Sequence, residues 1–217
     1  MPTRPATAPL IDDSSLVGTA LSRAWTEEID RWLASIVDTV DGGDAANTGD
    51  AARFALAAVG GYGRGELSPK SDLDLLLLHD GTTDIAATAE RIWYPIWDAG
   101  FKVGHAVRTP AEALDLAAGD LDTATSLLDI RHLGGDPALV AELADAAEAQ
   151  WRSRSEKVLA SMVKRTIERH AANGEVAFLL EPDLKLARGG LRDVHTLRWM
   201  DRADPTLLLP TERSGLA

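Results

Sequence analysis

Val59-Gly60-Gly61, ten intervening residues and then Asp72-Leu73-Asp74-Leu75 place a glycine turn shortly before a pair of aspartates. The apolar run from Phe54 to Val59 predicts a buried strand that the glycines end. A second strand is predicted from Asp72 to about His79. Residues two apart on a strand point to the same side, so Asp72 and Asp74 present two carboxylates together while Leu73 and Leu75 face the core.

Two carboxylates on one side of a strand repel each other unless a cation lies between them. Their oxygen atoms suit a hard cation such as Mg²⁺. The glycines upstream let the backbone approach a ligand closely and turn its amides toward an anion. Either feature alone is common on protein surfaces, and the stretch is neither a Walker A loop nor a G-x-G-x-x-G fingerprint. Their order and spacing predict a phosphate cradle beside a metal site, as nucleoside triphosphate chemistry requires.

The remaining sequence predicts one further strand and several helices. Apolar residues recur at helical spacing from Val17 to Val40 and again from Ile85 to Trp97. A third strand is predicted from Phe101 to Arg108. Thr109-Pro110-Ala111-Glu112 carries the features of a capped helix start. Further helices are predicted from Asp120, from Asp136, from Trp151 to about Ala172, and from Gly190 to Arg202.

These elements predict an α/β (α+β) fold in which a small mixed sheet is followed by a helical region. Residues 1–13 are expected to form a flexible tail because they are rich in Pro, Thr and Ala. Residues 14–109 are expected to hold the sheet with its leading helix. Residues 110–217 are expected to form the helical region.

Composition excludes several classes of protein. The 217 residues contain no cysteine, which excludes disulfide scaffolds, thiolate zinc sites and cysteine nucleophiles. Asp and Glu number 34 against 22 Lys and Arg, a net charge of −12 that disfavours nucleic acid as a partner. No apolar run approaches the ~18 residues of a membrane span, and no signal peptide is recognisable at the start. We therefore expect a cytoplasmic protein with no membrane partner.

The glycine turn and aspartate pair resemble the signature of the DNA polymerase β-like nucleotidyltransferase superfamily. More narrowly, residues 60–75 resemble the N-terminal catalytic domain of the bacterial [protein-PII] uridylyltransferase/uridylyl-removing enzymes. Three later stretches are similar to the same family, and their order along the chain is also that of the family. They are residues 97–109, residues 120–136, and residues 180–193 with the run Arg188-Gly189-Gly190-Leu191-Arg192-Asp193.

The resemblance implies transfer of UMP or AMP from UTP or ATP to a tyrosine of the PII nitrogen-regulatory protein, with Mg²⁺ as cofactor and release of pyrophosphate. It matches Asp72 and Asp74 to the catalytic, metal-binding pair. It matches Gly60 and Gly61 to the phosphate cradle. It also implies that full-length members continue into HD and ACT domains, so this chain is expected to be truncated before them.

Four other residues are candidates for the site. Arg64 is expected either to contact a phosphate or to pair with Glu66. Ser71 is expected either to hydrogen-bond a phosphate or simply to begin the strand. Relatives in the superfamily use a third acid, for which Asp129 and Asp98 are the candidates.

Two other functions remain open on the sequence. One is a small-molecule nucleotidyltransferase of the same superfamily, against which the three later stretches argue. The other is a non-catalytic nucleotide-binding or PII-binding fragment, which the unassigned third acid and the expected lack of the sensor domains keep open. The choice between UTP and ATP depends on residues that contact the base, and the oligomeric state has no signature in the sequence.

Overall fold

The computed structural model describes residues 4–44, 53–81, 85–178, 180–181 and 183–215. The chain divides into two compact units, Met1–Ala146 and Ala147–Ala217. No helix in the described ranges is both long and apolar enough to cross a membrane. The elements, in chain order, are α1 (Ala8–Asp12), α2 (Thr19–Asp44), β1 (Phe54–Ala58), α3 (Gly60–Gly63), β2 (Leu73–His79), α4 (Ala86–Asp98), β3 (Val103–Arg108), α5 (Pro110–Gly119), α6 (Leu121–Leu128), β4 (Arg131–Gly135), α7 (Pro137–Ser153), α8 (Ser155–Asn173), the 3₁₀ helix η1 (Val176–Phe178), α9 (Leu191–Ala203) and α10 (Pro210–Ser214).

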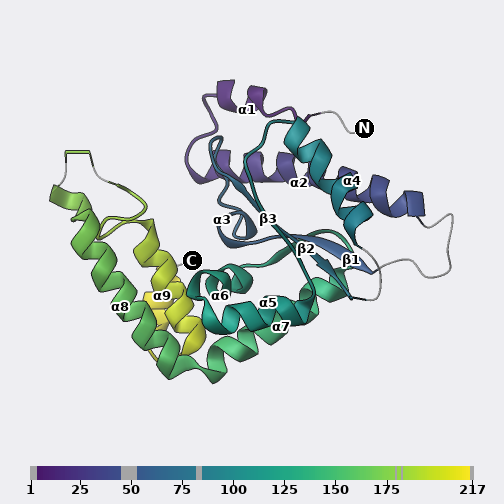
Figure 1. Ribbon diagram of the computed structural model, residues 1–217. Coiled ribbons are helices and arrows are strands. Elements are labelled where there is room, and N and C mark those ends of the chain that lie inside the picture. Colours follow the sequence, from purple (N-terminus) through teal and green to yellow (C-terminus); the bar gives the residue numbers. More distant parts are fainter. Residues whose placement is uncertain (1–3, 45–52, 82–84, 179, 182, 216–217) are drawn as a thin grey trace. The chain divides into compact units, whose positions relative to one another are not determined.

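The first unit contains a four-stranded mixed sheet in the order β3-β2-β1-β4 (Figure 1). β1 is antiparallel to both β2 and β4, whereas β3 runs parallel to β2. The parallel register pairs Asp74 with Gly104 and Leu76 with Ala106. The predicted mixed α/β fold with its three strands is therefore confirmed.

Helices α2 and α4 cover one face of this sheet (Figure 1). Alternate residues of β2 point toward these helices, so Leu73, Leu75 and Leu77 are buried there as the strand pattern predicts. The apolar faces of α2 and α4 complete the core. Their buried side chains include Trp25, Ile29, Leu33, Ile36, Val37, Ile92, Trp93 and Ile96. The core thereby fixes which face of β2 carries the aspartates.

The opposite face of the sheet is covered by α5, α6 and the first part of α7 (Figure 1). α5 begins as predicted, because Thr109 and Glu112 form a reciprocal capping box with Pro110 in the first turn. Asp120 caps α6 in the same manner by accepting the N–H of Thr123 at 2.8 Å. These caps fix where α6 starts, and α6 carries several side chains of the candidate site.

The short elements α3, η1 and α10 were not predicted from the sequence, and two further elements change the predicted picture. The first is β4, which adds a fourth strand to the sheet from within residues 110–217. Its sequence, Arg131-His132-Leu133-Gly134-Gly135, lacks an apolar alternation, and Gly134 is pressed so closely on α2 that a Cβ there would lie 2.9 Å from Val37. The second is α1, a single short helix within residues 1–13.

In the second unit, an aspartate ties α8 to α9. Asp193 accepts hydrogen bonds from Arg169, from His170 Nε2 at 2.9 Å and from the N–H of Gly189 at 2.7 Å. Burial opposes ionisation of this carboxyl, but the hydrogen bonds outweigh it and lower the pKa of Asp193 to about 2. The run Arg188-Gly189-Gly190-Leu191-Arg192-Asp193 thus forms a structural junction.

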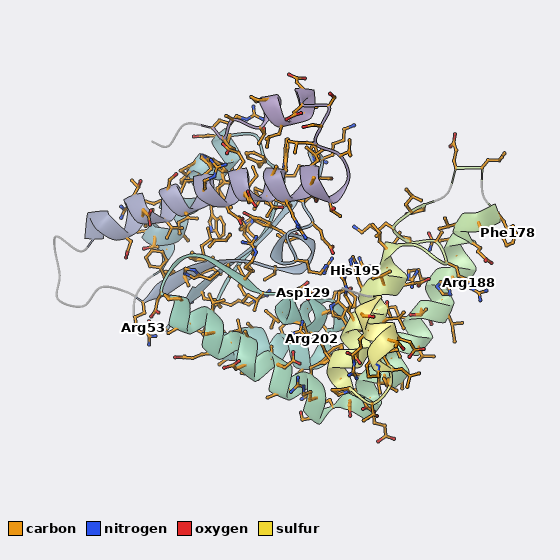
Figure 2. The ribbon with its side chains drawn as sticks, turned by 180° about the vertical axis from the view of Figure 1, so that it is seen from behind. Arg53, Asp129, Phe178, Arg188, His195 and Arg202 are labelled. Carbon is orange, nitrogen blue, oxygen red and sulfur yellow. The ribbon has the colours of Figure 1, made fainter. Side chains whose placement is uncertain are left out.

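Glycine is required in this junction. A Cβ on Gly190 would lie 2.7 Å from the carbonyl oxygen of Leu184, and Gly189 has a φ of +84°. Beyond the junction, the indole N–H of Trp151 donates to the carbonyl of Trp199 at 2.9 Å. Figure 2 shows Phe178 and Arg188 at the end of this unit where α8 stops, and 82% of Phe178 is exposed.

Candidate functional site

The aspartate pair lies at the beginning of β2. Asp72 immediately precedes the strand and Asp74 is its second residue, and both side chains are exposed, whereas Leu73 between them is buried. β2 begins one residue later than predicted. The two carboxylates therefore lie on the side of the sheet away from α2 and α4, as the alternation predicts.

The glycine turn is brought directly against Asp74. The N–H of Val59, at the end of β1, donates to the carbonyl of Asp74 at 3.0 Å. The chain then enters the single turn α3 through Gly60, whose φ is +57°. A Cβ on Gly60 would lie 3.8 Å from Asp74 Oδ2 and 3.6 Å from Ser126 Oγ. Gly60, Asp74 and Ser126 thus converge at one point, although they come from three different elements.

Gly104 on β3 also adjoins Asp74. A Cβ at this position would lie 2.6 Å from Asp74 Oδ1, a distance that real Cβ contacts do not show. The absence of a side chain at residue 104 therefore makes room for the carboxylate on the neighbouring strand. Sequence reasoning missed this glycine, because its role depends on the parallel register between β2 and β3.

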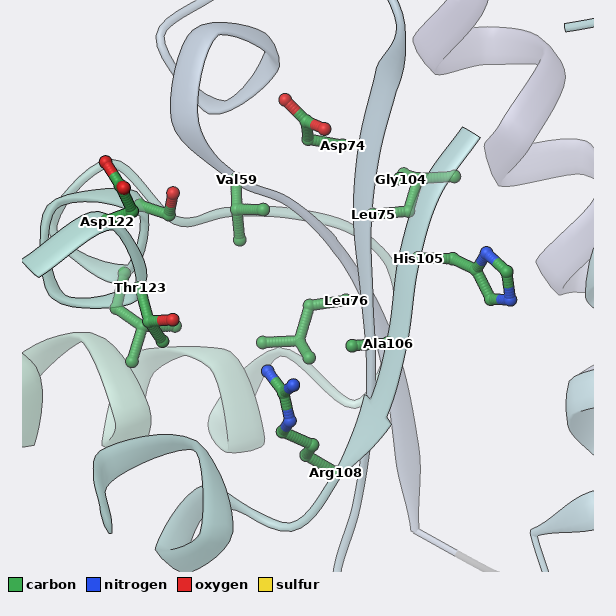
Figure 3. A pocket seen from close by; sticks show the side chains of 12 residues that line it. Val59, Asp74, Leu75, Leu76, Gly104, His105, Ala106, Arg108, Asp122 and Thr123 are labelled. Atoms are coloured by element: carbon green, nitrogen blue, oxygen red, sulfur yellow. The ribbon is translucent and has the colours of Figure 1, made fainter. Parts of the chain in front are cut away.

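A cavity of about 300 Å³ opens beside Asp74, between the face of β2 and β3 and the helix α6 (Figure 3). Asp122, Thr123 and Ser126 of α6 line it from one side, and Arg108 lies at the far end of β3. Sequence reasoning missed these residues as well. Figure 3 shows the ring of His105 directed away from the cavity, and the centre of this ring lies 5.1 Å from that of Trp93 in a tilted arrangement.

Arg64 follows the glycine turn and is held by two carboxylates. Its Nε donates to Glu66 at 2.8 Å, and another guanidinium N–H donates to Asp129 Oδ2 at 2.7 Å. The side chains of Arg64 and Asp129 are only 15% and 10% exposed. Of the two roles open to Arg64, the structure displays the pairing with Glu66, and it adds Asp129 as a second partner.

A second arginine, Arg131, holds the glycine turn through hydrogen bonds to its carbonyl groups. Arg131 on β4 donates to Asp30 of α2 at 2.7 Å and to the carbonyls of Tyr62 and Gly63 at 3.2 and 3.1 Å. The hydroxyl of Tyr62 also donates to Asp30, at 2.8 Å. Burial and the Asp30 carboxylate together raise the pKa of Tyr62 well above its usual value. α3 is thereby anchored to both α2 and β4.

The remaining candidates lie apart from the cavity. Ser71 closes a turn, in which its hydroxyl accepts the N–H of Ser68 at 3.0 Å. Asp98 is the exposed last residue of α4, and α4 covers the opposite face of the sheet. Asp129 ends α6 beside the glycine turn, where it is paired with Arg64. Of the carboxylates proposed from sequence, only Asp74 lines the cavity, and Asp122 joins it there.

The donor atoms present fit a magnesium ion that is completed by substrate. Among the described residues, no three His, Asp or Glu side chains gather closely enough to hold a metal ion alone. Mg²⁺ keeps several waters and is bound by one or two carboxylates together with substrate phosphates. Asp72 and Asp74 would supply such a pair: both are exposed, and Asp74 lies beside the glycine turn, whose first amides have no partner within the helix.

Two parts of the chain match known protein families. Residues 50–119 match the family model of the nucleotidyltransferase domain, and residues 157–206 match that of the GlnD PII-uridylyltransferase. A bifunctional uridylyltransferase/uridylyl-removing enzyme of Streptomyces coelicolor is 47% identical over 96% of this chain and 24% of its own length. The proteins of that name from Mycobacterium tuberculosis and Phenylobacterium zucineum are 44% and 42% identical, over 82% and 72% of this chain and 21% and 17% of their own lengths.

The mixed sheet and the match of residues 50–119 place a nucleotidyltransferase domain in the chain, and proteins of that class generally use a nucleoside triphosphate and a divalent metal ion. Within that class it belongs to the family of PII-uridylyltransferases, as the match in its second unit and the relatives show. The chain spans about a quarter of the length of the relative from Streptomyces coelicolor.

Proposed function

We propose that the chain transfers a nucleotidyl group, UMP or AMP, from UTP or ATP to a tyrosine hydroxyl of a PII signalling protein. The observation that carries this proposal is the convergence of Gly60 with Asp74 and Ser126, two residues that line the cavity. The names of the relatives support the choice of PII as acceptor. We place the reaction in the cytoplasm, where nucleoside triphosphates are available.

In this reaction the tyrosine oxygen forms a bond to the α-phosphorus, and the bond from that phosphorus to the bridging oxygen breaks. Pyrophosphate leaves with the bonding electron pair. A Mg²⁺ ion bound by Asp72 and Asp74 would neutralise charge on the phosphate oxygens. Gly60 and Gly61 let the triphosphate approach the backbone, whose amides in the first turn of α3 are available to it. A carboxylate accepts the hydroxyl proton, and Asp74 and Asp122 are the two that line the cavity.

Arg64 has a positioning role in this proposal. Its guanidinium joins Glu66, just after the turn, to Asp129 at the end of α6, and it thereby fixes the turn against the helix that lines the cavity. Asp129 and Asp98 remain the candidates for a third acid that the sequence supplied. The pairing of Asp129 with Arg64 favours a structural part for that carboxylate.

A labelled-nucleotide transfer assay tests the proposed function. The purified chain is incubated with Mg²⁺, a PII protein and α-labelled UTP or ATP, in parallel with Asp74→Asn. The matched control is Asp115→Asn, since Asp115 is an exposed acid on α5 outside the cavity. We expect label on PII from one donor, a loss of about a hundredfold or more in Asp74→Asn and no change in Asp115→Asn.

Two results would contradict the proposal. Equal transfer by wild type and Asp74→Asn would show that this carboxylate takes no part in the chemistry. Mg²⁺-dependent nucleotide binding without transfer to PII from either donor would identify a nucleotide-binding module instead.

A further inference from the structure

The cavity beside Asp74 extends well beyond the carboxylates that the transfer step uses. Its volume of about 300 Å³ lies at the lower end of the range for small-molecule sites in proteins. Of the aspartate pair and the glycine turn, only Asp74 lines this space, at one end of it. The rest of the cavity has its own lining, which indicates the chemistry of what fills it.

The floor of the cavity is formed by alternate residues of two paired strands. Asp74 and Leu76 come from β2, and Gly104, Ala106 and Arg108 come from β3. The small residues at 104 and 106 leave space above the sheet. From Gly104 to Arg108 the strand rises about 13 Å, at 3.3 Å per residue. The floor is thus a narrow strip of the sheet with the carboxylate of Asp74 at one end and the guanidinium of Arg108 at the other.

The wall is formed by α6. Leu127 contributes an apolar side chain to this wall, whereas Asp122, Thr123 and Ser126 contribute a carboxylate and two hydroxyls. Figure 3 shows Asp122 and Thr123 on one side of the space and Arg108 at its lower end. An apolar middle with polar groups at the edges suits a flat heterocycle joined to a sugar, which has apolar faces and hydrogen-bonding edges.

We propose that this cavity binds the nucleoside moiety of the donor, which runs along β3 from Gly104 toward Arg108. This proposal rests on the proposed function, because the α-phosphate must lie at the Asp74 end. Asp122 accepts hydrogen bonds from sugar hydroxyls or ring N–H groups. Arg108 has only N–H donors, so it contacts carbonyl or ring-nitrogen acceptors of the base and takes part in the choice between UTP and ATP.

The test fills the floor of the cavity without touching the phosphate end. In Ala106→Leu, a branched side chain occupies the space above β3. The matched control is Ala111→Leu, the same change at an exposed position of α5. Calorimetry with Mg²⁺ measures binding of UTP, ATP and inorganic tripolyphosphate to each purified protein. We expect Ala106→Leu to weaken binding of the preferred nucleotide by about tenfold or more and to leave tripolyphosphate within about twofold of wild type.

A second variant tests the same cavity in case Ala106→Leu fails to fold. Arg108→Gln keeps a long side chain but removes the charge, and it is expected to change the ratio of UTP to ATP affinity while tripolyphosphate binding is retained. Circular dichroism confirms that each variant is folded. The control Ala111→Leu is expected to bind all three ligands as wild type does.

The outcomes separate this proposal from the proposed function. Unchanged nucleotide binding in both Ala106→Leu and Arg108→Gln would overturn the nucleoside cavity and leave the transfer reaction standing. An equal loss of tripolyphosphate and nucleotide in folded Ala106→Leu would also overturn it, because the cavity would then serve the phosphates. A wild-type chain that binds neither tripolyphosphate nor nucleotide would contradict the proposed function itself.

Discussion

At the scale of single residues, the site depends on a position that contributes no side chain. Gly104 adjoins Asp74 so closely that even a methyl group would overlap the carboxylate. The carboxylate of Asp74 therefore fits beside the backbone of β3 only because residue 104 has no side chain. A glycine on an exposed edge strand would otherwise weaken the sheet, since glycine loses the most conformational freedom on folding.

We predict that Gly104→Ala displaces Asp74 and lowers nucleotidyl transfer by about tenfold or more, since misplacement of a reacting group by 1 Å is costly. The fold should survive, because residue 104 lies on an outer strand and is exposed. The measurement is kcat with PII and Mg²⁺, together with Tm. The control is Gly119→Ala, where a new Cβ meets no atom within 4 Å. Full activity in Gly104→Ala would show that Asp74 tolerates a shifted position.

At the scale of elements, the short helix α3 is held in place by its neighbours. Four residues are too few to form a stable helix alone. Arg131 binds two of its carbonyls, Tyr62 reaches α2, and Gly63 lies under the end of α6. A Cβ on Gly63 would lie 1.7 Å from the carbonyl oxygen of Asp129, so the two backbones are in direct contact.

We predict that Gly63→Ala forces α3 away from α6 and destabilises the first unit by about 3 kcal/mol, as overpacking of a tight interior does. Urea unfolding followed by fluorescence of the tryptophans on α2 and α4 measures this loss. The control is Gly119→Ala, which is expected to leave stability nearly unchanged because a Cβ there meets no atom within 4 Å and φ is not positive. A Gly63→Ala variant as stable as wild type would disprove the close contact between α3 and α6.

In the second unit, the junction of α8 and α9 is predicted to lose stability in acid. The pKa of Asp193 is lowered to about 2, so its ionised form stabilises the fold at every pH above about 4. This contribution is lost as the pH falls from about 4 to about 2. Because a quarter of the side chain is exposed to water, we expect Asp193→Asn to cost only about 1–2 kcal/mol at pH 7 and almost nothing near pH 2.

Hydrogen exchange of the α8 and α9 amides, measured by mass spectrometry at several pH values, checks this prediction. The exposed Glu168→Gln, on α8, serves as the control, since its contact with Lys164 at 3.9 Å contributes little. A loss of protection in Asp193→Asn that is independent of pH would show that geometry, and not charge, holds the junction.

At the scale of the whole molecule, the net charge of −12 governs what the chain meets in solution. An acidic surface repels a polyphosphate backbone, because binding a nucleic acid requires neutralisation of its phosphates by Lys and Arg. A nucleoside triphosphate is also an anion, but in the proposed function the backbone amides of α3 and a Mg²⁺ ion would receive it. We therefore expect the chain to bind a small phosphate ligand and not a nucleic acid.

We predict that neither DNA nor RNA is retained by the chain at physiological salt, in a filter-binding assay at micromolar protein. Tripolyphosphate with Mg²⁺ should still bind in the same buffer. Retention of nucleic acid that falls steeply with salt would instead reveal a basic surface able to overcome the net charge.

Much of this architecture could be predicted from the sequence, because its signals are local. The strands around Asp72 and Asp74, the glycine turn and the capped start at Thr109 each depend on neighbours along the chain. β4 escaped prediction because two of its five residues are glycines and its place depends on pairing with β1. Asp122, Ser126 and Gly104 escaped for a related reason, since only tertiary packing brings α6 and β3 to Asp74. The roles of the predicted site residues remain predictions.

The pairing of β2 with β3 has a consequence for how errors in folding would affect the chemistry. A slip of one residue would bring His105 beside Asp74 and turn Gly104 toward the core, since side chains alternate along a strand. Gly104 has no side chain with which to oppose such a slip. Val103 and Val107, which pack against the core on the far face, supply that opposition. Val103 and Val107 therefore help to keep Gly104 beside Asp74, although both valines lie on the face of the sheet away from the cavity.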